Sequence, residues 1–180
     1  MAFELKKEQY YTFEEYLEID DGNKYELKDG ILYMMSAPSP IHQDISTELI
    51  FQLKLFLRDR ACKVTHEINV RLFKDEDTSV IPDILVICDN SKMTDSGYIG
   101  APDFIIEIAS PSNPDKDYLE KLIDYRDAGV KEYWIISPEK KKILTYTLKE
   151  NKYELAVYTF NDLIEVGTLS GCQLDLTMFK

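Results

Sequence analysis

Two nearly continuous apolar segments, residues 80–88 (VIPDILVIC) and residues 104–109 (FIIEIA), limit the possible fold more than any other feature of the chain. Such apolar runs are typical of strands that are covered on both faces of a sheet. We therefore expect both segments in the interior of a sheet that has layers packed on either side. Each run contains one acidic residue, Asp83 or Glu107, at a position that otherwise favours apolar side chains.

Helical patterns surround these two segments. Residues 41–60 repeat apolar side chains along one face of a helix, and the Ser-Pro pair before them suits the N-cap and the first helical position. A short helix within residues 12–19 opens with a T-x-x-E capping box. A further helix over residues 118–128 is expected to end at Gly129, because glycine is the usual C′ residue.

Extended patterns account for much of the remaining chain. Residues 25–34 contain two short extended runs around an Asp-Gly turn, and residues 143–160 contain two runs around a polar tetrapeptide, so each segment is predicted to form a β-hairpin. Residues 64–72 alternate with a period of two, which predicts one continuous strand with His66 on its buried face. Residues 130–136 return as a buried strand after the last helix, and this strand–helix–strand order implies a parallel crossover.

The element order predicts an α/β protein, on the borderline of α+β, in which helices flank a mixed sheet and hairpins lie at its periphery. A chain of 180 residues is expected to form one domain over residues 1–180. No apolar run is long enough to cross a bilayer. The beginning of the chain lacks an apolar signal segment, and Cys62, Cys88 and Cys172 show no pairing pattern. We therefore expect reduced thiols in a cytoplasmic protein.

The net charge of −12, from 33 acidic and 21 basic residues, disfavours a high-affinity, non-specific DNA binder, because such proteins usually present a basic surface to phosphates. The same charge argues less strongly against a metal-dependent nuclease, whose site must itself be acidic. The sequence contains no Gly-rich phosphate loop, no Ser-His-Asp pattern and no Cys/His zinc spacing.

Asp83 and Glu107 are the candidate site residues. An ionised carboxylate in an apolar strand is costly unless it is paired, hydrogen-bonded or bound to a metal. Two such carboxylates on neighbouring strands are expected to converge, and their repulsion raises a pKa or recruits a cation. One interpretation is a Mg²⁺ site, since this ion is typically held by one or two carboxylates with waters and a substrate phosphate. The alternative is structural, with Asp83 bound by backbone N–H groups and Glu107 paired with a basic core residue.

His42 and Gln43 stand at the start of the long predicted helix and also allow two interpretations. In the first, they contact a substrate phosphate or a water at the scissile bond. In the second, His42 fills or caps the helix entry, and Gln43 is an exposed polar residue without a function. The sequence leaves both interpretations open.

Six short motifs carry a resemblance to one nuclease family. They are Tyr25-Glu26-Leu27-x-Asp29-Gly30, Ser39-Pro40-x-His42-Gln43, Pro82-Asp83, Gly100-Ala101-Pro102-Asp103, Glu107-x-x-Ser110-Pro111-Ser112 and Lys121-x-x-x-Tyr125-x-x-Ala128-Gly129-Val130-x-Glu132-Tyr133-Trp134. Each motif alone is weak. The ordered set, over about residues 11–138, closely resembles the Uma-type family of restriction endonucleases in the PD-(D/E)XK nuclease superfamily.

The resemblance implies a restriction-endonuclease-like fold and a divalent-metal site for Mg²⁺ or Mn²⁺. Carried over by position, Asp83 and Glu107 would be the metal ligands. Glu26, in the first predicted hairpin, would be an additional acidic member of the catalytic site.

The motif lysine of this superfamily lies two residues after the second acid, and that position is Ala109 in this chain. Lys121 is the best candidate to take over its role, and Lys116 is the alternative. Such a lysine would orient the attacking water or stabilise the charge that develops on the phosphate.

The first functional hypothesis is a Mg²⁺-dependent or Mn²⁺-dependent endonuclease that hydrolyses phosphodiester bonds of DNA, and a homodimer is expected because such enzymes often cut two strands. The second is a catalytically inactive protein with the nuclease fold that serves as a binding or assembly module. Ala109 and the charge of −12 favour the second hypothesis. A third possibility is a nuclease for RNA or for a branched junction.

Overall fold

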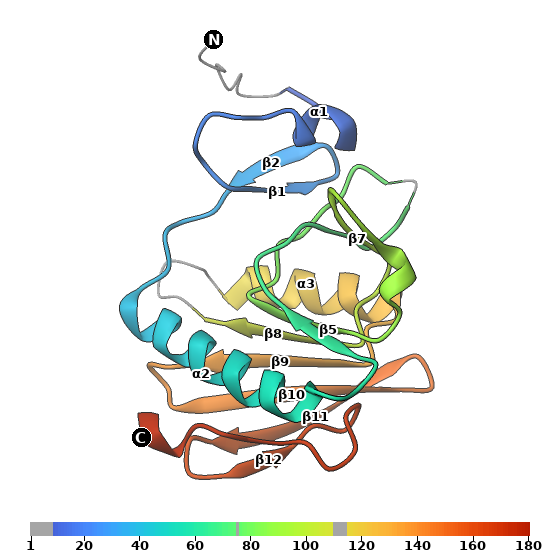
Figure 1. Cartoon of the computed structure of the whole chain (residues 1–180). Helices are drawn as coiled ribbons and strands as arrows, with labels where there is room; N and C mark the ends of the chain where they lie inside the picture. Colours follow the sequence, from blue (N-terminus) through green and yellow to red (C-terminus); the bar gives the residue numbers. More distant parts are fainter. Residues whose placement is uncertain (1–8, 75, 110–114) are drawn as a thin grey trace.

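A six-stranded mixed sheet is the centre of the molecule (Figure 1). The structure, a computed structural model, describes residues 9–74, 76–109 and 115–180. Neighbouring strands of the sheet follow the order β11-β10-β9-β8-β5-β3. In chain order they are β3 (Lys63–Thr65), β5 (Ile84–Ile87), β8 (Phe104–Ile108), β9 (Glu132–Ser137), β10 (Lys142–Lys149) and β11 (Lys152–Thr159). The two apolar segments supply β5 and β8, and every residue of these two strands is buried, as their composition predicts.

The predicted parallel crossover is present. Strands β8 and β9 pair in parallel, and α3 (Asp115–Ala128) lies between them in the chain. The other neighbouring pairs of this sheet are antiparallel. The expected α/β architecture on the α+β borderline, with a mixed sheet between helices, is therefore confirmed.

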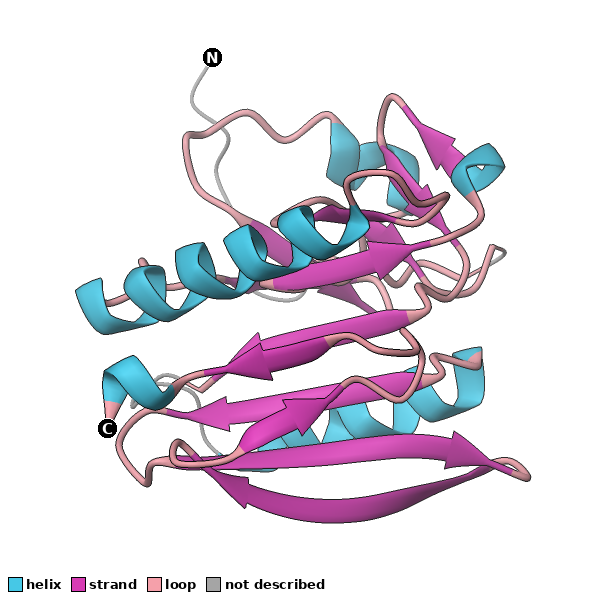
Figure 2. Cartoon of the chain, turned by 60° about the horizontal axis from the view of Figure 1, so that its bottom comes forward, coloured by secondary structure: helices cyan, strands magenta, loops and turns pink. Residues whose placement is uncertain are grey.

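Helices cover both faces of the sheet (Figure 2). Helix α2 (Pro40–Leu57) packs its stripe of buried aliphatic side chains on one face, where Phe104 and Trp134 meet edge to face with their ring centroids 5.2 Å apart. Helix α3 covers the opposite face, where Tyr125 meets Tyr133 at 4.9 Å between centroids. Side chains at the ends of β5 and β8 can therefore contact a helix on either side of the sheet.

Local sequence signals determine where the first two helices begin. Thr12 and Glu15 form a complete capping box at the start of α1 (Phe13–Leu17), as the T-x-x-E motif predicts. Ser39 caps α2, and its side chain accepts a hydrogen bond from the His42 N–H. Because this cap fixes the first turn of α2, it also fixes the position of His42.

Helix α3 ends where it was predicted to end. Gly129 has a φ of 92°, a conformation that glycine adopts without the cost that a Cβ imposes. Its N–H and that of Val130 both donate to the Tyr125 carbonyl, which closes the last turn. The helix begins at Asp115, earlier than the predicted residue 118.

The two predicted hairpins are confirmed. Strands β1 and β2 pair across Asp29 and Gly30, whose φ angles are 50° and 74°. Strands β10 and β11 pair across Glu150 and Asn151, whose φ angles are 47° and 63°. Both turns need two successive residues with positive φ, the pattern of a type I′ hairpin turn.

Smaller elements surround the main sheet. Two-stranded sheets are formed by β1 with β2 and by β12 with β13, and β4, β7 and β6 form a three-stranded sheet. The bounds are β1 (Tyr25–Lys28), β2 (Ile31–Met34), β4 (Val70–Arg71), 3-10 helix η1 (Asn90–Lys92), β6 (Met93–Thr94), β7 (Gly97–Ile99), β12 (Leu163–Glu165), β13 (Gln173–Asp175) and 3-10 helix η2 (Thr177–Phe179).

The prediction of one strand over residues 64–72 is wrong. Two short strands, β3 and β4, lie there and belong to different sheets. The chain turns between them at Glu67, which has a φ of 49° and donates its N–H to the Pro82 carbonyl. His66 is exposed and is not the core residue that the alternating pattern suggested. Alternation predicts which side chains turn inward, but it does not reveal a residue that leaves the β region.

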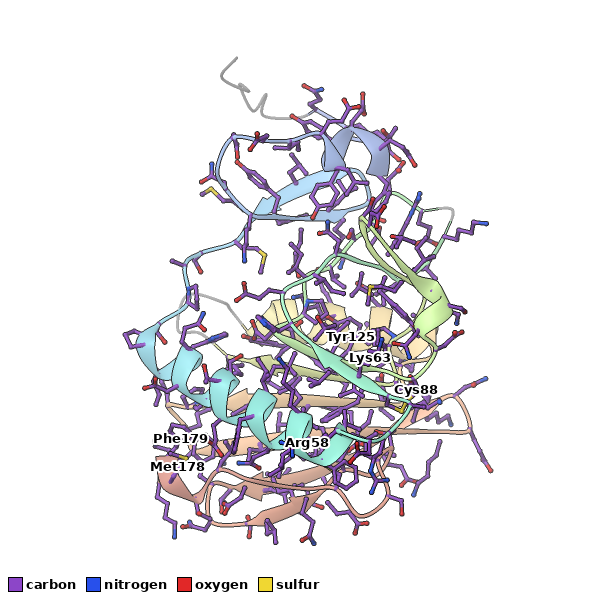
Figure 3. All side chains as sticks on the ribbon, viewed as in Figure 1. Arg58, Lys63, Cys88, Tyr125, Met178 and Phe179 are labelled. Carbon is purple, nitrogen blue, oxygen red and sulfur yellow. A yellow bond between two sulfur atoms is a disulfide. The ribbon has the colours of Figure 1, made fainter. Side chains whose placement is uncertain are left out.

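The expectation of reduced thiols is wrong for two of the three cysteines, because Cys62 and Cys88 form a disulfide. Cys62 precedes β3 and Cys88 follows β5, and the pairing of Lys63 with Ile87 brings the two cysteines opposite each other. Figure 3 labels Cys88 at this end of β5. Sequence spacing could not predict the bond, since it depends on the register of two separate strands. Cys172 is a buried free thiol.

Gly97 permits a close approach between β7 and the segment before β4. A Cβ at Gly97 would lie 2.2 Å from the Asn69 carbonyl oxygen, which accepts the Tyr98 N–H. Substitution of Gly97 by alanine is therefore expected to lower the free energy of unfolding by several kcal/mol, because the backbone itself must move. Urea unfolding followed by circular dichroism measures this loss.

Gly22→Ala is the matched control. Gly22 also has a positive φ, 83°, but a Cβ there meets no atom within 4 Å. This variant should lose only the roughly 1–2 kcal/mol that a left-handed conformation costs a residue with a Cβ. Equal losses in the two variants would contradict the close contact at Gly97.

Candidate active site

Glu107 is a buried carboxylate that receives two hydrogen bonds from α3. It lies near the end of β8, and only 5% of its surface is exposed. The Lys121 ammonium donates to Glu107 Oε1 at 3.1 Å, and the Tyr125 hydroxyl donates to the same oxygen at 2.9 Å. Lys121 and Tyr125 stand four residues apart, so both project from one face of α3.

Glu26 is joined to Glu107 through Lys121. The Lys121 ammonium donates to Glu26 Oε1 at 2.9 Å, and the same oxygen accepts the Ile81 N–H at 2.9 Å. Lys121 is buried, so its charge is balanced by carboxylates more than by water. Acids from β1 and β8, far apart in the sequence, therefore share one ammonium group.

Asp83 lies just before β5 and beside Glu107. The antiparallel register of β5 and β8, extended by one pair, places Asp83 opposite Glu107. Asp83 Oδ2 accepts the Ile108 N–H at 2.7 Å and lies 3.0 Å from His42 Nε2. Asp83 is thus hydrogen-bonded both to the strand that carries Glu107 and to α2.

His42 contacts Asp83 from the α2 side of the sheet, opposite to the side from which Lys121 reaches Glu107. Burial lowers the pKa of His42, but its hydrogen bond to Asp83 and the charges of Asp83, Glu107 and Glu67 outweigh burial, so the pKa is raised. The ring therefore favours the form that donates its Nε2–H to Asp83. Its Nδ1 is buried and has no hydrogen-bond partner in the described part of the chain.

The electrostatics of the site centre on Glu107. Burial raises the pKa of Glu107 to about 8; the Lys121 charge opposes this rise, the charges of Asp83 and Glu26 add to it, and the Tyr125 hydrogen bond opposes it. Burial, together with the charge of Glu107, raises the pKa of Tyr125 well above its usual value. Tyr125 therefore remains a neutral hydrogen-bond donor at neutral pH, whereas Glu107 changes its protonation state at about pH 8.

The three carboxylates have the chemistry of a site for a hard divalent cation. Each uses a single oxygen for the hydrogen bonds described above, and within residues 9–74, 76–109 and 115–180 no hydrogen bond reaches the second oxygen. Asp83 and Glu107 therefore fit Mg²⁺ or Mn²⁺ held by two carboxylates and waters. No three His, Cys, Asp or Glu side chains of the described residues form a metal site by themselves. Water or a substrate phosphate would have to complete the coordination.

The structure brings together most of the residues that the sequence singled out. Lys121 joins Glu26 and Glu107, and His42 is hydrogen-bonded to Asp83. The two sets of contacts form one group because Asp83 faces Glu107 across the adjacent strands.

Other residues of the predicted site lie outside this group. Gln43 is exposed on the first turn of α2. Lys116 lies in the first turn of α3, but its side chain is not among those described, and the motif residues 110–112 are outside the described part of the chain. Ala109, at the position of the missing lysine, is half-buried directly after β8.

Tyr125 was given no role by the sequence reasoning, although it binds Glu107 as closely as Lys121 does. The signal that could have revealed it is its spacing, since a residue four positions after Lys121 must share the same helix face. The Nε2 contact between His42 and Asp83 had no such signal, because it joins a helix and a strand that are separate in the sequence.

A comparison with protein families identifies the chain. Residues 12–177 match the Uma2 family, which is described as "Putative restriction endonuclease". The chain belongs to this family. The match covers every residue of the candidate site, and the family membership supports a nuclease. None of the curated proteins compared with this Uma2-family chain matches it.

A solved structure gives independent support for the fold. The crystal structure of a "putative nuclease belonging to DUF820" from Anabaena variabilis ATCC 29413 is similar to the Uma2-family chain, with a TM-score of 0.76. The similarity covers 93% of this chain and 96% of that chain, at 22% sequence identity. At this identity the likeness establishes a shared nuclease-like fold and says nothing of activity.

Glu107→Gln is expected to change how stability depends on pH. The pKa of Glu107 is about 8 in the folded protein and 4.5 when unperturbed, so between these values the folded state binds more protons than the unfolded state. Stability therefore falls as pH rises through this range. The variant should lack this fall and should gain on the wild type with rising pH, by an amount that approaches several kcal/mol at about 1.4 kcal/mol per pKa unit.

Urea unfolding at a series of pH values measures the difference between the two proteins. Glu139→Gln, at an exposed glutamate after β9, is the control and should follow the wild type throughout. A Glu107→Gln curve parallel to that of the wild type would contradict the raised pKa of Glu107.

Proposed function

We propose that this Uma2-family chain is a divalent-metal-dependent endonuclease that hydrolyses phosphodiester bonds of DNA. The observation that carries the proposal is the buried Lys121, which joins Glu26 and Glu107, with Asp83 opposite Glu107 on the adjacent strand. Phosphodiester hydrolysis needs a cation site next to a positive group that can face a phosphate. Carboxylates that lie close together can supply the cation site, and a buried ammonium beside them can supply the positive group.

Asp83 and Glu107 would hold the metal. When bound, a Mg²⁺ or Mn²⁺ ion supplies Lewis-acid chemistry and a more acidic water. Because the negative charges of Asp83 and Glu26 help to raise the pKa of Glu107, a cation at this position would favour its ionised form. Binding of the metal ion would in this way offset the free-energy cost of burying the ionised form of Glu107.

Lys121 would act in place of the lysine that is missing at Ala109. Its ammonium lies 3.1 Å from Glu107 Oε1, within reach of a water or a phosphate oxygen beside that carboxylate. It would orient the attacking water or stabilise the negative charge that develops on the phosphate. Glu26 would position Lys121, since it holds the same ammonium at 2.9 Å from the other side.

His42 and Gln43 would have different roles. His42 is buried and hydrogen-bonded to Asp83 Oδ2, so it would orient the Asp83 carboxylate and would not touch the substrate. Gln43 is exposed on the same turn and remains the candidate for a contact with the substrate backbone.

We also infer a homodimer and a cytoplasmic location. A dimer would give an endonuclease two sites for the two strands of a duplex. The cytoplasmic location is inferred from the proposed DNA substrate alone. Reduced thiols no longer support it, since Cys62 and Cys88 are paired. In the described part of the chain no helix is long and apolar enough to span a membrane.

The alternative function is a catalytically inactive module that keeps the nuclease fold. Ala109 and the net charge of −12 favour it, because the first removes the usual motif lysine and the second opposes binding to phosphates. The two functions differ in what they require at Asp83, since an enzyme needs metal there and a module does not.

Calorimetric titration of Mn²⁺ into the wild type and into Asp83→Asn is the primary test. We expect saturable binding by the wild type and a loss of at least tenfold in affinity in the variant, because a carboxylate ligand becomes a neutral amide. Asp44→Asn, at an exposed position on α2, is the matched control and should bind like the wild type.

Cleavage of supercoiled plasmid DNA with Mn²⁺ completes this test, with a single-stranded RNA in a parallel arm. Cleavage by the wild type that is lost in Asp83→Asn supports the nuclease. Metal binding that does not depend on Asp83, together with no cleavage that depends on Asp83, would favour the inactive module. Cleavage of the RNA alone would mean that the substrate is RNA and not DNA.

Lys121→Met is expected to lower the rate of cleavage strongly while Mn²⁺ binding is kept. Loss of a charge-stabilising group typically lowers the rate by about 10²–10³-fold, whereas removal of a cation near Asp83 and Glu107 should not weaken metal affinity. Plasmid cleavage and calorimetry on the same preparation measure the two effects. Lys116→Met tests the alternative lysine, and if it loses activity while Lys121→Met keeps it, the role belongs to Lys116.

A further inference from the structure

Strand β11 forms one edge of the six-stranded sheet, and its outer side is open (Figure 2). It pairs with β10 over eight consecutive residues, from Lys142 opposite Thr159 to Lys149 opposite Lys152, without a bulge. Among the described strands none pairs with its other side. An unpaired edge of this length is a template for another strand.

The outer side of β11 carries the backbone groups of the odd-numbered residues. In a hairpin with a two-residue turn, the residues that flank the turn, Lys149 and Lys152, form a hydrogen-bonded pair, and such pairs alternate along the strands. The N–H of Thr159 agrees with this pattern, since it donates to Asp162 and not to β10. Leu155 and Val157 therefore direct their N–H and C=O groups away from the sheet.

The same two residues are exposed apolar side chains. Leu155 is 55% exposed and Val157 is 57% exposed. They stand opposite Tyr146 and Leu144 of β10, which are half-buried on the face that α3 covers, so the apolar layer of that face extends to the sheet edge. Two features that usually prevent pairing, a proline and a bulge, are absent from β11, and its charged residues, Lys152 and Glu154, lie toward the turn, before Leu155 and Val157.

We propose that this edge binds a second copy of the chain, with β11 of the two copies antiparallel and Ala156 on the two-fold axis. A two-fold axis perpendicular to the sheet keeps the same face on the same side. It therefore pairs odd-numbered residues with odd-numbered residues. In this register Leu155 lies opposite the partner's Val157, and Val157 lies opposite the partner's Leu155. Each exposed side chain gains an apolar neighbour, and the central residues exchange four backbone hydrogen bonds.

Charge disfavours the registers in which the axis lies at Leu155 or Glu154, whereas the pairing of Leu155 with Val157 favours the axis at Ala156. Lys152 and Glu154 are the charged residues of β11 and cancel, so the edge is neutral in a chain of net charge −12. With Ala156 on the axis, the two Glu154 carboxylates are four residues apart along the strands, about 13 Å, which exceeds the Debye length of about 8 Å in physiological salt. An axis at Leu155 would bring them to about 7 Å, and an axis at Glu154 would place them directly opposite each other.

The surface is independent of the proposed chemistry. The homodimer is part of the proposed function, but its interface is inferred from β11 alone, three strands away from the Glu107 strand in the sheet order. Because edge pairing buries a small area, we expect a dissociation constant in the micromolar range. Association is measured without substrate or metal, so its failure would leave the nuclease proposal untouched.

Sedimentation velocity over a concentration series tests the surface. We expect a concentration-dependent dimer for the wild type and at least a tenfold weaker dimer for Val157→Lys, which places a charge between the paired strands. Leu163→Lys is the matched control, since Leu163 is 56% exposed on β12, and it should associate like the wild type. A wild type that stays monomeric at the highest concentration, or equal effects of the two substitutions, would overturn the proposal.

A cysteine placed on the axis tests the register. Ala156→Cys should form an intermolecular disulfide on mild oxidation, because residues opposite each other in a non-hydrogen-bonded pair have Cα atoms about 4.5 Å apart. Glu154→Cys should not, since its two copies are about 13 Å apart. The native cysteines interfere little, because Cys62 and Cys88 are paired and Cys172 is buried. Cross-linking of Glu154→Cys in preference to Ala156→Cys would exclude this register.

Discussion

The Lys121 ammonium is the contact on which the arrangement of the site depends. It lies 2.9 Å from Glu26 and 3.1 Å from Glu107 and so links α3 with β1 and β8. The Lys121 charge lowers the pKa of Glu107, but burial and the charges of Asp83 and Glu26 outweigh it, so the pKa is still raised to about 8. Lys121 therefore contributes both to the contact between the first hairpin and α3 and to the charge state of Glu107.

Asp83 and His42 extend this arrangement to the other side of the sheet. Helix α3 supplies the donors to Glu107, and α2 supplies the donor to Asp83, so the two acids are oriented from opposite layers. The Ile108 N–H fixes Asp83 to the strand of Glu107 itself. A site built in this way leaves both carboxylates little freedom to rotate, which is the condition for binding an ion with strict geometric demands such as Mg²⁺.

Much of the fold could be predicted because its signals are local. The capping box at Thr12, the Ser39 cap and Gly129 each determine a helix end through residues within one turn, and the apolar runs around Asp83 and Glu107 identify strands covered on both faces. The errors concern features that depend on the backbone at one residue or on register. The strand predicted over residues 64–72 breaks at the positive φ of Glu67.

The disulfide and the site show how far register limits prediction. The bond between Cys62 and Cys88 follows from the pairing of β3 with β5, and no spacing in the sequence indicates it. The residues of the candidate site could be named in advance, since acids in apolar strands and the family motifs marked them. Their connections could not, because the contacts of Lys121 with Glu26 and of His42 with Asp83 join elements that only the folded chain brings together.

The single tryptophan of the chain stands in an informative place. Trp134 is almost completely buried, its indole N–H donates to Glu132 Oε1 at 2.7 Å, and its register partner on β8 is Ile106, the residue before Glu107. Its fluorescence can be excited apart from that of the twelve tyrosines, and its emission depends on whether the ring is dry and rigidly packed. The chain thus carries its own optical probe on the strand beside Glu107, and no label is needed to follow what happens there.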